Sequence, residues 1–148
     1  MDNIVLKYAY LEKEIQELKS VKIKLIISLL DDGENLEFGL DEEKSICEAN
    51  GIEFENLPIK DMSVPGFERF VDCVNKLYSK LKQVEKLMIH CNHGQGRSGL
   101  FMAGILIRNG MKLKDALKLI ELKRGFQCPS TKGQLEFLKA YESFLINT

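Results

Sequence analysis

A cysteine and an arginine six positions apart frame a short glycine-containing stretch, His90-Cys91-Asn92-His93-Gly94-Gln95-Gly96-Arg97-Ser98-Gly99. The apolar run at 86–89 before it is typical of a strand, and the apolar run at 100–107 after it is typical of a buried helix. Backbone N–H groups in a turn between a strand and a helix can converge on one point, where the helix N-terminus adds its positive dipole end. The pattern therefore predicts an anion-binding loop with the sulfur of Cys91 at its centre.

Six residues of this loop are expected to bind the anion, and two of them are glycines with the backbone freedom that a tight turn requires. They are Asn92, His93, Gly94, Gln95, Gly96 and Arg97. Arg97 is expected to donate a planar pair of hydrogen bonds to two phosphate oxygens, a geometry that lysine cannot match. We also expect Gly99 to let the following helix pack closely against the strand.

The same positive field is expected to lower the pKa of the Cys91 thiol below that of an ordinary cysteine, because cationic groups and helix N-termini favour the thiolate. Ser98 is expected to donate its hydroxyl to the sulfur, and His90 to order the loop by hydrogen bonding to its backbone. A nucleophilic sulfur inside an anion site is the arrangement that cleavage of a phosphate ester needs. The competing interpretation is a buried cysteine in a glycine turn.

The run fits His-Cys-x-x-Gly-x-x-Arg-Ser, the signature of the cysteine-dependent protein tyrosine phosphatase superfamily. The whole chain resembles the small, atypical dual-specificity branch of that superfamily. The resemblance implies a phosphoric monoester hydrolase with a phosphate-binding loop and a cysteinyl-phosphate intermediate. It implies neither a cofactor nor a metal ion.

Expelling an alkoxide or phenolate calls for a proton donor, and Asp61 is the leading candidate. Asp61 lies between Pro58 and Pro65, thirty positions before the cysteine, in a segment similar to the acid loop of dual-specificity phosphatases. The alternative is that Asp61 only makes a turn by bonding its own backbone. The Asp31-Asp32 pair is a rival, since its loop is expected to edge the same cleft. The predicted catalytic residues are Cys91, Arg97, Asp61 and Ser98.

Strand-like segments alternate along the chain with segments of helical periodicity. The predicted strands lie within 21–30, 52–58 and 87–90, and the predicted helices at 8–20, 41–50, 66–81, 97–109, 113–123 and 131–145. This alternation predicts a three-layer α/β fold, in which helices flank a short, mostly parallel central sheet. No strand is predicted in residues 1–7, so the strand or hairpin that relatives have before their first helix is expected to be missing.

Length and composition favour one globular domain over residues 1–148, with 45% apolar and 29% charged residues. The formal net charge of −1 gives no reason to expect nucleic acid or an anionic membrane as the main partner. No window approaches the roughly 18 apolar residues of a membrane span. We therefore expect a cytoplasmic monomer, and the family resemblance implies that its partner is a phosphorylated protein or peptide.

The four cysteines, Cys47, Cys73, Cys91 and Cys128, show no paired spacing, so neither a zinc site nor a disulfide scaffold is indicated. Cys47 and Cys73 lie in helix-like segments and are interpreted as small buried hydrophobic residues. The sequence leaves open whether Cys47, Cys73 or Cys128 pairs with Cys91 under oxidation, because proximity cannot be derived from spacing.

The stretch 123–134 resembles the family segment that carries Arg-Pro and then Thr-x-x-Gln before the final helix. Gly125 stands in place of the usual proline, which suggests a looser turn. Thr131 is expected to cap the helix. Gln134 is interpreted as an amide on the helix surface, and orientation of a water molecule is the alternative.

Substrate selectivity is less constrained by the sequence than the chemistry is. The classical tyrosine-specific members of the superfamily carry a Tyr-bearing segment that deepens their cleft, and no such segment is visible in this sequence. A shallow site is therefore expected, with phosphotyrosine, and with it phosphoserine and phosphothreonine, as substrate. The variable loop positions lack the lysines typical of inositol-lipid phosphatases. The His-Cys-x-His-Gly pattern that includes His93 resembles the RNA 5′-triphosphatase branch. That branch continues with Asn-Arg-Thr, however, where this chain has Gly96-Arg97-Ser98. A thiol-dependent arsenate reductase also uses Cys-x5-Arg, although there the loop lies near the N-terminus with further cysteines soon after.

Overall fold

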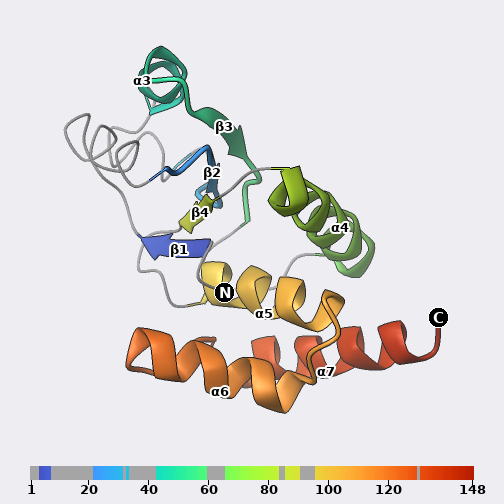
Figure 1. Ribbon diagram of the computed structural model, residues 1–148. Helices are drawn as coiled ribbons and strands as arrows, with labels where there is room; N and C mark the ends of the chain where they lie inside the picture. Colours follow the sequence, from blue (N-terminus) through green and yellow to red (C-terminus); the bar gives the residue numbers. More distant parts are fainter. Residues whose placement is uncertain are drawn as a thin grey trace.

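The computed structural model describes residues 4–7, 22–31, 33, 43–59, 66–83, 86–90, 96–129 and 131–148 (Figure 1). Four strands of this part form one parallel sheet in the order β1-β4-β2-β3. They are β1 (Ile4–Lys7), β2 (Leu25–Ser28), β3 (Glu53–Asn56) and β4 (Leu87–His90). The predicted short parallel sheet is therefore confirmed.

All four strands end in the same row of the sheet. In the register of the parallel pairs, Lys7 is opposite His90, His90 is opposite Ser28, and Ser28 is opposite Asn56. The chain enters the loop of Cys91 directly after His90, in the middle of this row. The carboxyl edge of the sheet, where ligands bind in parallel α/β folds, thus carries the predicted site.

The expectation that the first strand is missing is wrong. Ile4–Lys7 forms β1, which lies at one edge of the sheet and pairs along its whole length with β4. Only Ile4, Val5 and Leu6 are apolar, a run too short to distinguish a strand from the start of a loop. The pairing with β4, which local sequence does not encode, determines the conformation.

Helices on both faces of the sheet complete the three predicted layers. They are α3 (Glu43–Ala49), α4 (Phe67–Gln83), α5 (Arg97–Arg108), α6 (Leu113–Arg124) and α7 (Lys132–Ile146). Figure 1 shows α3 on one side of the sheet and the other four helices gathered on the opposite side. The helix predicted at 8–20 lies outside the described residues. None of the described helices is long and apolar enough to cross a bilayer.

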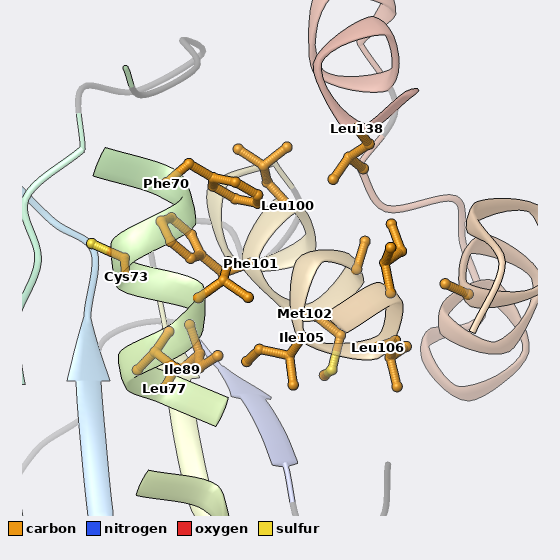
Figure 2. Close-up of a cluster of buried hydrophobic side chains, with 14 of the residues drawn as sticks. Phe70, Cys73, Leu77, Ile89, Leu100, Phe101, Met102, Ile105, Leu106 and Leu138 are labelled. Carbon is orange, nitrogen blue, oxygen red and sulfur yellow. The ribbon is translucent and has the colours of Figure 1, made fainter. Parts of the chain in front are cut away.

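The two apolar clusters follow from side-chain alternation along the strands. Ile26 and Met88 point to the cluster beneath α3, which Cys47 joins. The neighbouring strand positions, such as Leu25 and Ile89, belong to the larger cluster beneath α4 and α5 (Figure 2). The interpretation of Cys47 and Cys73 as buried residues is confirmed, since Cys73 lies in this larger cluster.

Helix α5 lies at the centre of the larger cluster, and every residue from Arg97 to Ile107 is buried. The rings of Phe70 and Phe101 pack with centroids 5.0 Å apart. A Cβ atom on Gly104 would lie 2.7 Å from Cζ of Phe70, so this glycine allows α4 to approach α5 closely. The helix that follows the predicted anion loop is thereby held closely against α4.

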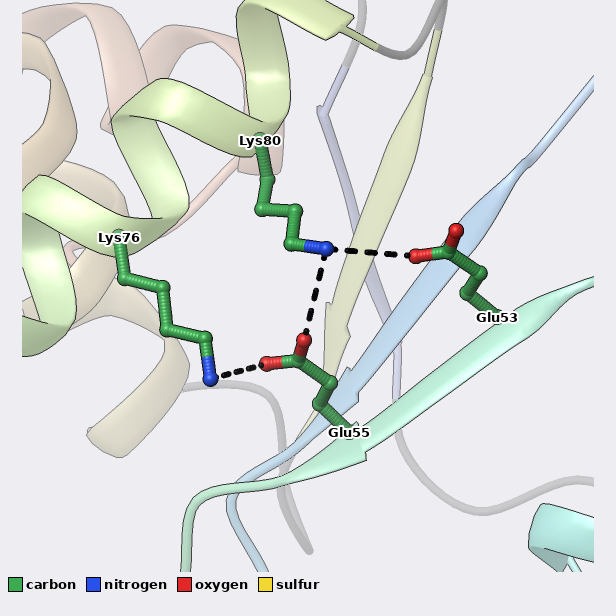
Figure 3. A network of polar contacts seen from close by, with 4 residues as sticks. All are labelled: Glu53, Glu55, Lys76 and Lys80. Carbon is green, nitrogen blue, oxygen red and sulfur yellow. Dashed lines mark ion pairs between the residues drawn. The ribbon is translucent and has the colours of Figure 1, made fainter.

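Edge strand β3 is tied to α4 by charged side chains (Figure 3). Lys76 lies 3.0 Å from Glu55, and Lys80 lies 3.6 Å from Glu53 and 3.9 Å from Glu55. Partly exposed ion pairs of this kind contribute little to stability. Their charges also discourage pairing of this edge with another chain.

Helix ends follow the signals in the sequence. Gly51 after α3 has φ +74°, and Gly125 caps α6 in the left-handed region with φ +84°. The Gly125 N–H donates to the Glu121 carbonyl at 2.8 Å, so the turn that we expected to be looser is a hydrogen-bonded helix cap. The Thr131 side chain accepts from the Gln134 N–H at 3.2 Å, which confirms Thr131 as the N-cap of α7.

Candidate active site

The N-terminus of α5 has no side-chain cap from its own N-cap residue. Its N-cap residue is Gly96, which has no side chain to accept a hydrogen bond from the N–H groups of the first turn. Such groups carry a partial positive charge and are satisfied by water or by a bound ligand. The predicted loop residues Cys91, Asn92, His93, Gly94 and Gln95 lie outside the described residues. Their expected roles remain predictions.

Arg97 is buried, with 1% of its surface exposed, at the start of α5. Its Nη1 atom donates to the carbonyl oxygen of Ile59 at 2.9 Å and to that of Leu29 at 3.5 Å. The guanidinium is thus fixed by the two loops that follow β3 and β2. A cation held in this way needs no movement of its own when an anion arrives.

The two loops are joined to each other beneath Arg97. The Leu57 N–H donates to the Ser28 carbonyl at 2.8 Å, and the Ile59 N–H donates to the Leu29 carbonyl at 3.0 Å. These bonds carry the pairing of β2 and β3 past the ends of both strands. Asp61, two positions after Ile59, lies outside the described residues, and its role as proton donor remains a prediction.

Ser98 and His90 flank the loop on its two sides. Ser98 is completely buried in the first turn of α5. His90 ends β4, with its backbone opposite Ser28 of β2, and its side chain is outside the described part. The structure therefore places both residues at the carboxyl edge of the sheet. The expected hydrogen bond from Ser98 to the sulfur of Cys91 remains a prediction.

The interpretation of Gln134 as a surface amide is wrong. Gln134 is 1% exposed, and its amide Nε2 lies 2.9 Å from where a Cβ atom on Gly96 would stand. Neither Nε2 nor Oε1 has a hydrogen-bond partner among the residues that the structure describes. Gln134, Leu138 and Tyr141 are the buried residues of α7, and this helical spacing is the signal that could have revealed it.

Gly99 has a different neighbour from the one predicted. A Cβ atom there would lie 2.2 Å from Sγ of Cys128 and 2.9 Å from the nitrogen of Pro129. The glycine therefore makes room for the segment between α6 and α7 rather than for a strand. Buried Cys128 thus packs against the first turn of α5.

Burial raises the pKa of the Cys73 thiol above its ordinary value, an effect that Arg69 and Lys76 nearby only oppose in part. Cys73 lies in α4 within the apolar core. A thiol in this setting is a poor nucleophile, because the thiolate is the reactive form. Its environment is the opposite of that expected for Cys91 at a helix N-terminus.

A family model described as "Polymorphic toxin system, DSP-PTPase phosphatase" matches residues 4–111. Protein tyrosine phosphatase domain-containing protein 1 of Bos taurus is 32% identical over 142 residues, which cover 89% of this chain and 18% of the bovine protein. Protein tyrosine phosphatase type IVA 2 of Mus musculus is 29% identical over 135 residues, which cover 90% of this chain and 75% of that protein. The chain spans only a minor part of several curated relatives that it matches.

The fold is also that of a solved phosphatase. The crystal structure of kinase associated phosphatase superimposes with a TM-score of 0.88 at 23% identity, covering 98% of this chain and 88% of that one. The chain belongs to the DSP-PTPase phosphatase family. The predicted membership of the cysteine-dependent tyrosine and dual-specificity phosphatases is thus confirmed.

Proposed function

We propose that this chain hydrolyses phosphate monoesters on proteins, acting on phosphotyrosine and on phosphoserine and phosphothreonine, through a phosphorylated Cys91. One observation supports this most strongly. Arg97 is the first residue of α5 and follows the segment that carries the cysteine. Its buried guanidinium donates to the carbonyl groups of Ile59 and Leu29. A buried cation at an uncapped helix N-terminus is suited to binding a doubly charged phosphate group.

In the first step, the Cys91 thiolate attacks phosphorus in line, forming the S–P bond while the P–O bond to the leaving group breaks. Asp61 gives its proton to the departing oxygen. The two hydrogens of Arg97 Nη1 face the carbonyls of Ile59 and Leu29. The opposite guanidinium edge, Nε with Nη2, carries the parallel N–H pair that matches two phosphate oxygens.

In the second step, Asp61 takes a proton from water, whose oxygen attacks phosphorus. The S–P bond breaks, inorganic phosphate leaves, and the sulfur returns as a thiolate. Ser98, at the beginning of α5 beside the loop, stabilises this thiolate as the leaving group. The positive field of the loop and Arg97 supplies the charge stabilisation for both steps.

We propose a phosphoprotein as the substrate class, and two kinds of observation support this choice. The curated relatives reported above are named protein tyrosine phosphatases. The loop positions 92, 93, 95 and 96 carry no lysine, and the formal net charge is −1. A multiply charged inositol lipid or RNA substrate would be expected to select more basic residues around the loop.

Hydrolysis of p-nitrophenyl phosphate and a phosphopeptide panel by wild type, Cys91→Ser and Asp61→Asn tests the proposal. Cys91→Ser should lose all turnover, and Asp61→Asn should lose about a hundredfold to ten-thousandfold on peptides with poor leaving groups. Asp72→Asn, an exposed aspartate on α4, serves as the matched control and should match wild type. Turnover that persists in Cys91→Ser would exclude the covalent mechanism.

Three further comparisons define the substrate and the acid. If phosphoinositide vesicles or RNA 5′-triphosphate are hydrolysed faster than every phosphopeptide, the proposed substrate class is wrong. Thiol-dependent reduction of arsenate without phosphatase turnover would point to a reductase. Should Asp31→Asn lower the rate while Asp61→Asn does not, the proton donor lies in the loop after β2.

A further inference from the structure

The side chain of Asn56 joins the end of β3 to the end of β2 and to the segment that follows β2, which holds Arg97. Nδ2 of Asn56 donates to the Ser28 carbonyl at 3.0 Å and to the Leu30 carbonyl at 2.9 Å. Because both partners are carbonyl oxygens, only the NH₂ end of the amide can face them. Asn56 thus uses both hydrogens of its amide to bridge the last residue of β3 to the segment that follows β2.

The carbonyl groups of three consecutive residues are thereby all engaged at this edge. Those of Ser28 and Leu30 accept from Asn56, and the carbonyl of Leu29 between them accepts from Arg97 Nη1 at 3.5 Å and from the Ile59 N–H at 3.0 Å. The Leu29 carbonyl therefore lies between two residues that Asn56 helps to hold, and the Leu57 N–H shares the Ser28 carbonyl at 2.8 Å. Asn56 also lies three positions before Ile59, whose carbonyl accepts from Arg97 at 2.9 Å.

We propose that Asn56 is a positioning residue of the phosphate site: by fastening the segment after β2 to the end of β3, it holds the carbonyls that orient Arg97. This inference rests on the proposed function of Arg97 as the phosphate ligand. Asn56 does not touch the reacting atoms in this scheme. It sets the angle at which the guanidinium meets the phosphate, and a bidentate contact depends strongly on that angle.

A purely structural role would have a different signature, and the chain offers a matched residue that has one. Asn50, also partly buried, donates from Nδ2 to the Ile46 carbonyl at 2.8 Å at the end of α3. Asn50 precedes β3, so it lies near the amino end of this strand, whereas the phosphate site lies beyond the carboxyl end. Loss of either amide should destabilise the fold, but only loss of Asn56 should weaken phosphate binding.

The experiment compares Asn56→Ala with Asn50→Ala by calorimetric titration with inorganic phosphate and by steady-state hydrolysis of p-nitrophenyl phosphate. For Asn56→Ala we expect the dissociation constant of phosphate and KM to rise about tenfold, as for loss of about one hydrogen bond between the misaligned guanidinium and the phosphate, with kcat within about threefold. Asn56→Ser keeps one donor and should give an intermediate rise, so the test survives if Asn56→Ala does not fold. Asn50→Ala should bind phosphate as wild type does.

A double-mutant cycle shows whether Asn56 acts through Arg97. In an Arg97→Lys background the fork is gone, so Asn56→Ala should change phosphate affinity by less than about twofold. Equal phosphate affinity of wild type, Asn56→Ser and Asn56→Ala would overturn the proposal, as would an undiminished effect in the Arg97→Lys background. A wild type that binds phosphate but turns over no ester would contradict the proposed function, while the binding comparison would still decide the role of Asn56.

Discussion

The two ends of helix α5 have opposite designs. At its N-terminus, Gly96 offers no cap, Arg97 is buried against backbone carbonyls, and the amide of Gln134 has no partner among the described residues. At its C-terminus, Arg108 is exposed, donates to Asn75 at 2.9 Å and lies over the ring of Tyr78. Polar side chains are buried at the N-terminal end, whereas at the C-terminal end they form their hydrogen bonds at the surface.

The last carbonyl groups at the C-terminal end are also satisfied by backbone hydrogen bonds. The N–H groups of Asn109, Gly110 and Met111 donate to the last carbonyls of the helix at 3.0, 2.9 and 3.1 Å. Tyr78 adds a bond from its hydroxyl to Oδ1 of Asn109 at 3.0 Å. A groove of about 720 Å³ lies beside this end, lined in part by Ile107 and Arg108.

The difference shows where this fold gives up stability. Buried polar groups that lack partners cost free energy, and proteins keep them mainly at functional sites. In the described part of the structure, the buried amide of Gln134 without a partner lies beside the N-terminus of α5, whereas the C-terminus of the same helix is capped in the ordinary way. Variants at matched positions of the two ends therefore test whether the N-terminal end is functional.

The largest expected effect is that of Arg97→Lys. Lysine cannot donate the planar pair of hydrogen bonds, so kcat/KM on a phosphopeptide should fall about a hundredfold to a thousandfold. Arg108→Lys, at the other end of the same helix, should stay within about twofold of wild type. Similar losses in the two variants, measured by initial rates, would remove the functional contrast between the ends.

Gly99→Ala should cost about 1–3 kcal/mol in the free energy of unfolding, because its Cβ atom would overlap the sulfur of Cys128 and the backbone of Pro129. Gly110 at the other end has φ +101° and open space around a Cβ, so Gly110→Ala meets only backbone strain of about 1 kcal/mol. Urea denaturation of both variants checks this order. A milder effect at Gly99 would mean that the segment between α6 and α7 yields easily.

Gln134→Met should lower turnover about tenfold if the amide beside Gly96 orients the attacking water, the alternative role given above, while the unfolding free energy stays unchanged or rises by about 1 kcal/mol. An apolar side chain of similar length removes a buried amide without partners in the described structure. Tyr78→Phe should show the reverse pattern, with normal turnover and a small loss of stability, because it removes a satisfied bond. A Gln134→Met protein with full activity and reduced stability would make Gln134 a packing residue only.

The smallest expected effect is a fall in stability at alkaline pH. Burial raises the pKa of the Cys73 thiol above 9.0 and that of the Tyr141 hydroxyl above 10.0. Their contribution to stability is fully present below those ordinary values and is lost as the pH rises above them. The unfolding free energy should therefore fall as the pH rises above the ordinary pKa of a cysteine thiol and then above that of a tyrosine hydroxyl. The unfolding free energy should fall less steeply with pH in a Cys73→Ala, Tyr141→Phe double variant, as measured by urea denaturation at a series of pH values. An equally steep fall in the double variant would contradict the attribution to these two groups.

Most elements of the fold could be predicted because their signals are local. The apolar run of β2 and the helical stripe of α4, including Phe70 and Leu77, lie within one segment each. Strand β1 was missed because three apolar residues become a strand only through pairing with β4. The family could also be predicted, since the Cys-x5-Arg motif and its flanking elements are contiguous in the chain.

The sequence by itself determined the order of the described elements from β2 onward and the residue types available for phosphate chemistry between β4 and α5. Only the tertiary structure decided what Arg97, Gln134 and Gly99 contact. Their neighbours, Ile59, Gly96 and Cys128, are 38, 38 and 29 positions away in the chain. Periodicity and spacing report which face of an element is buried, whereas the partner across that face is set by how distant elements pack.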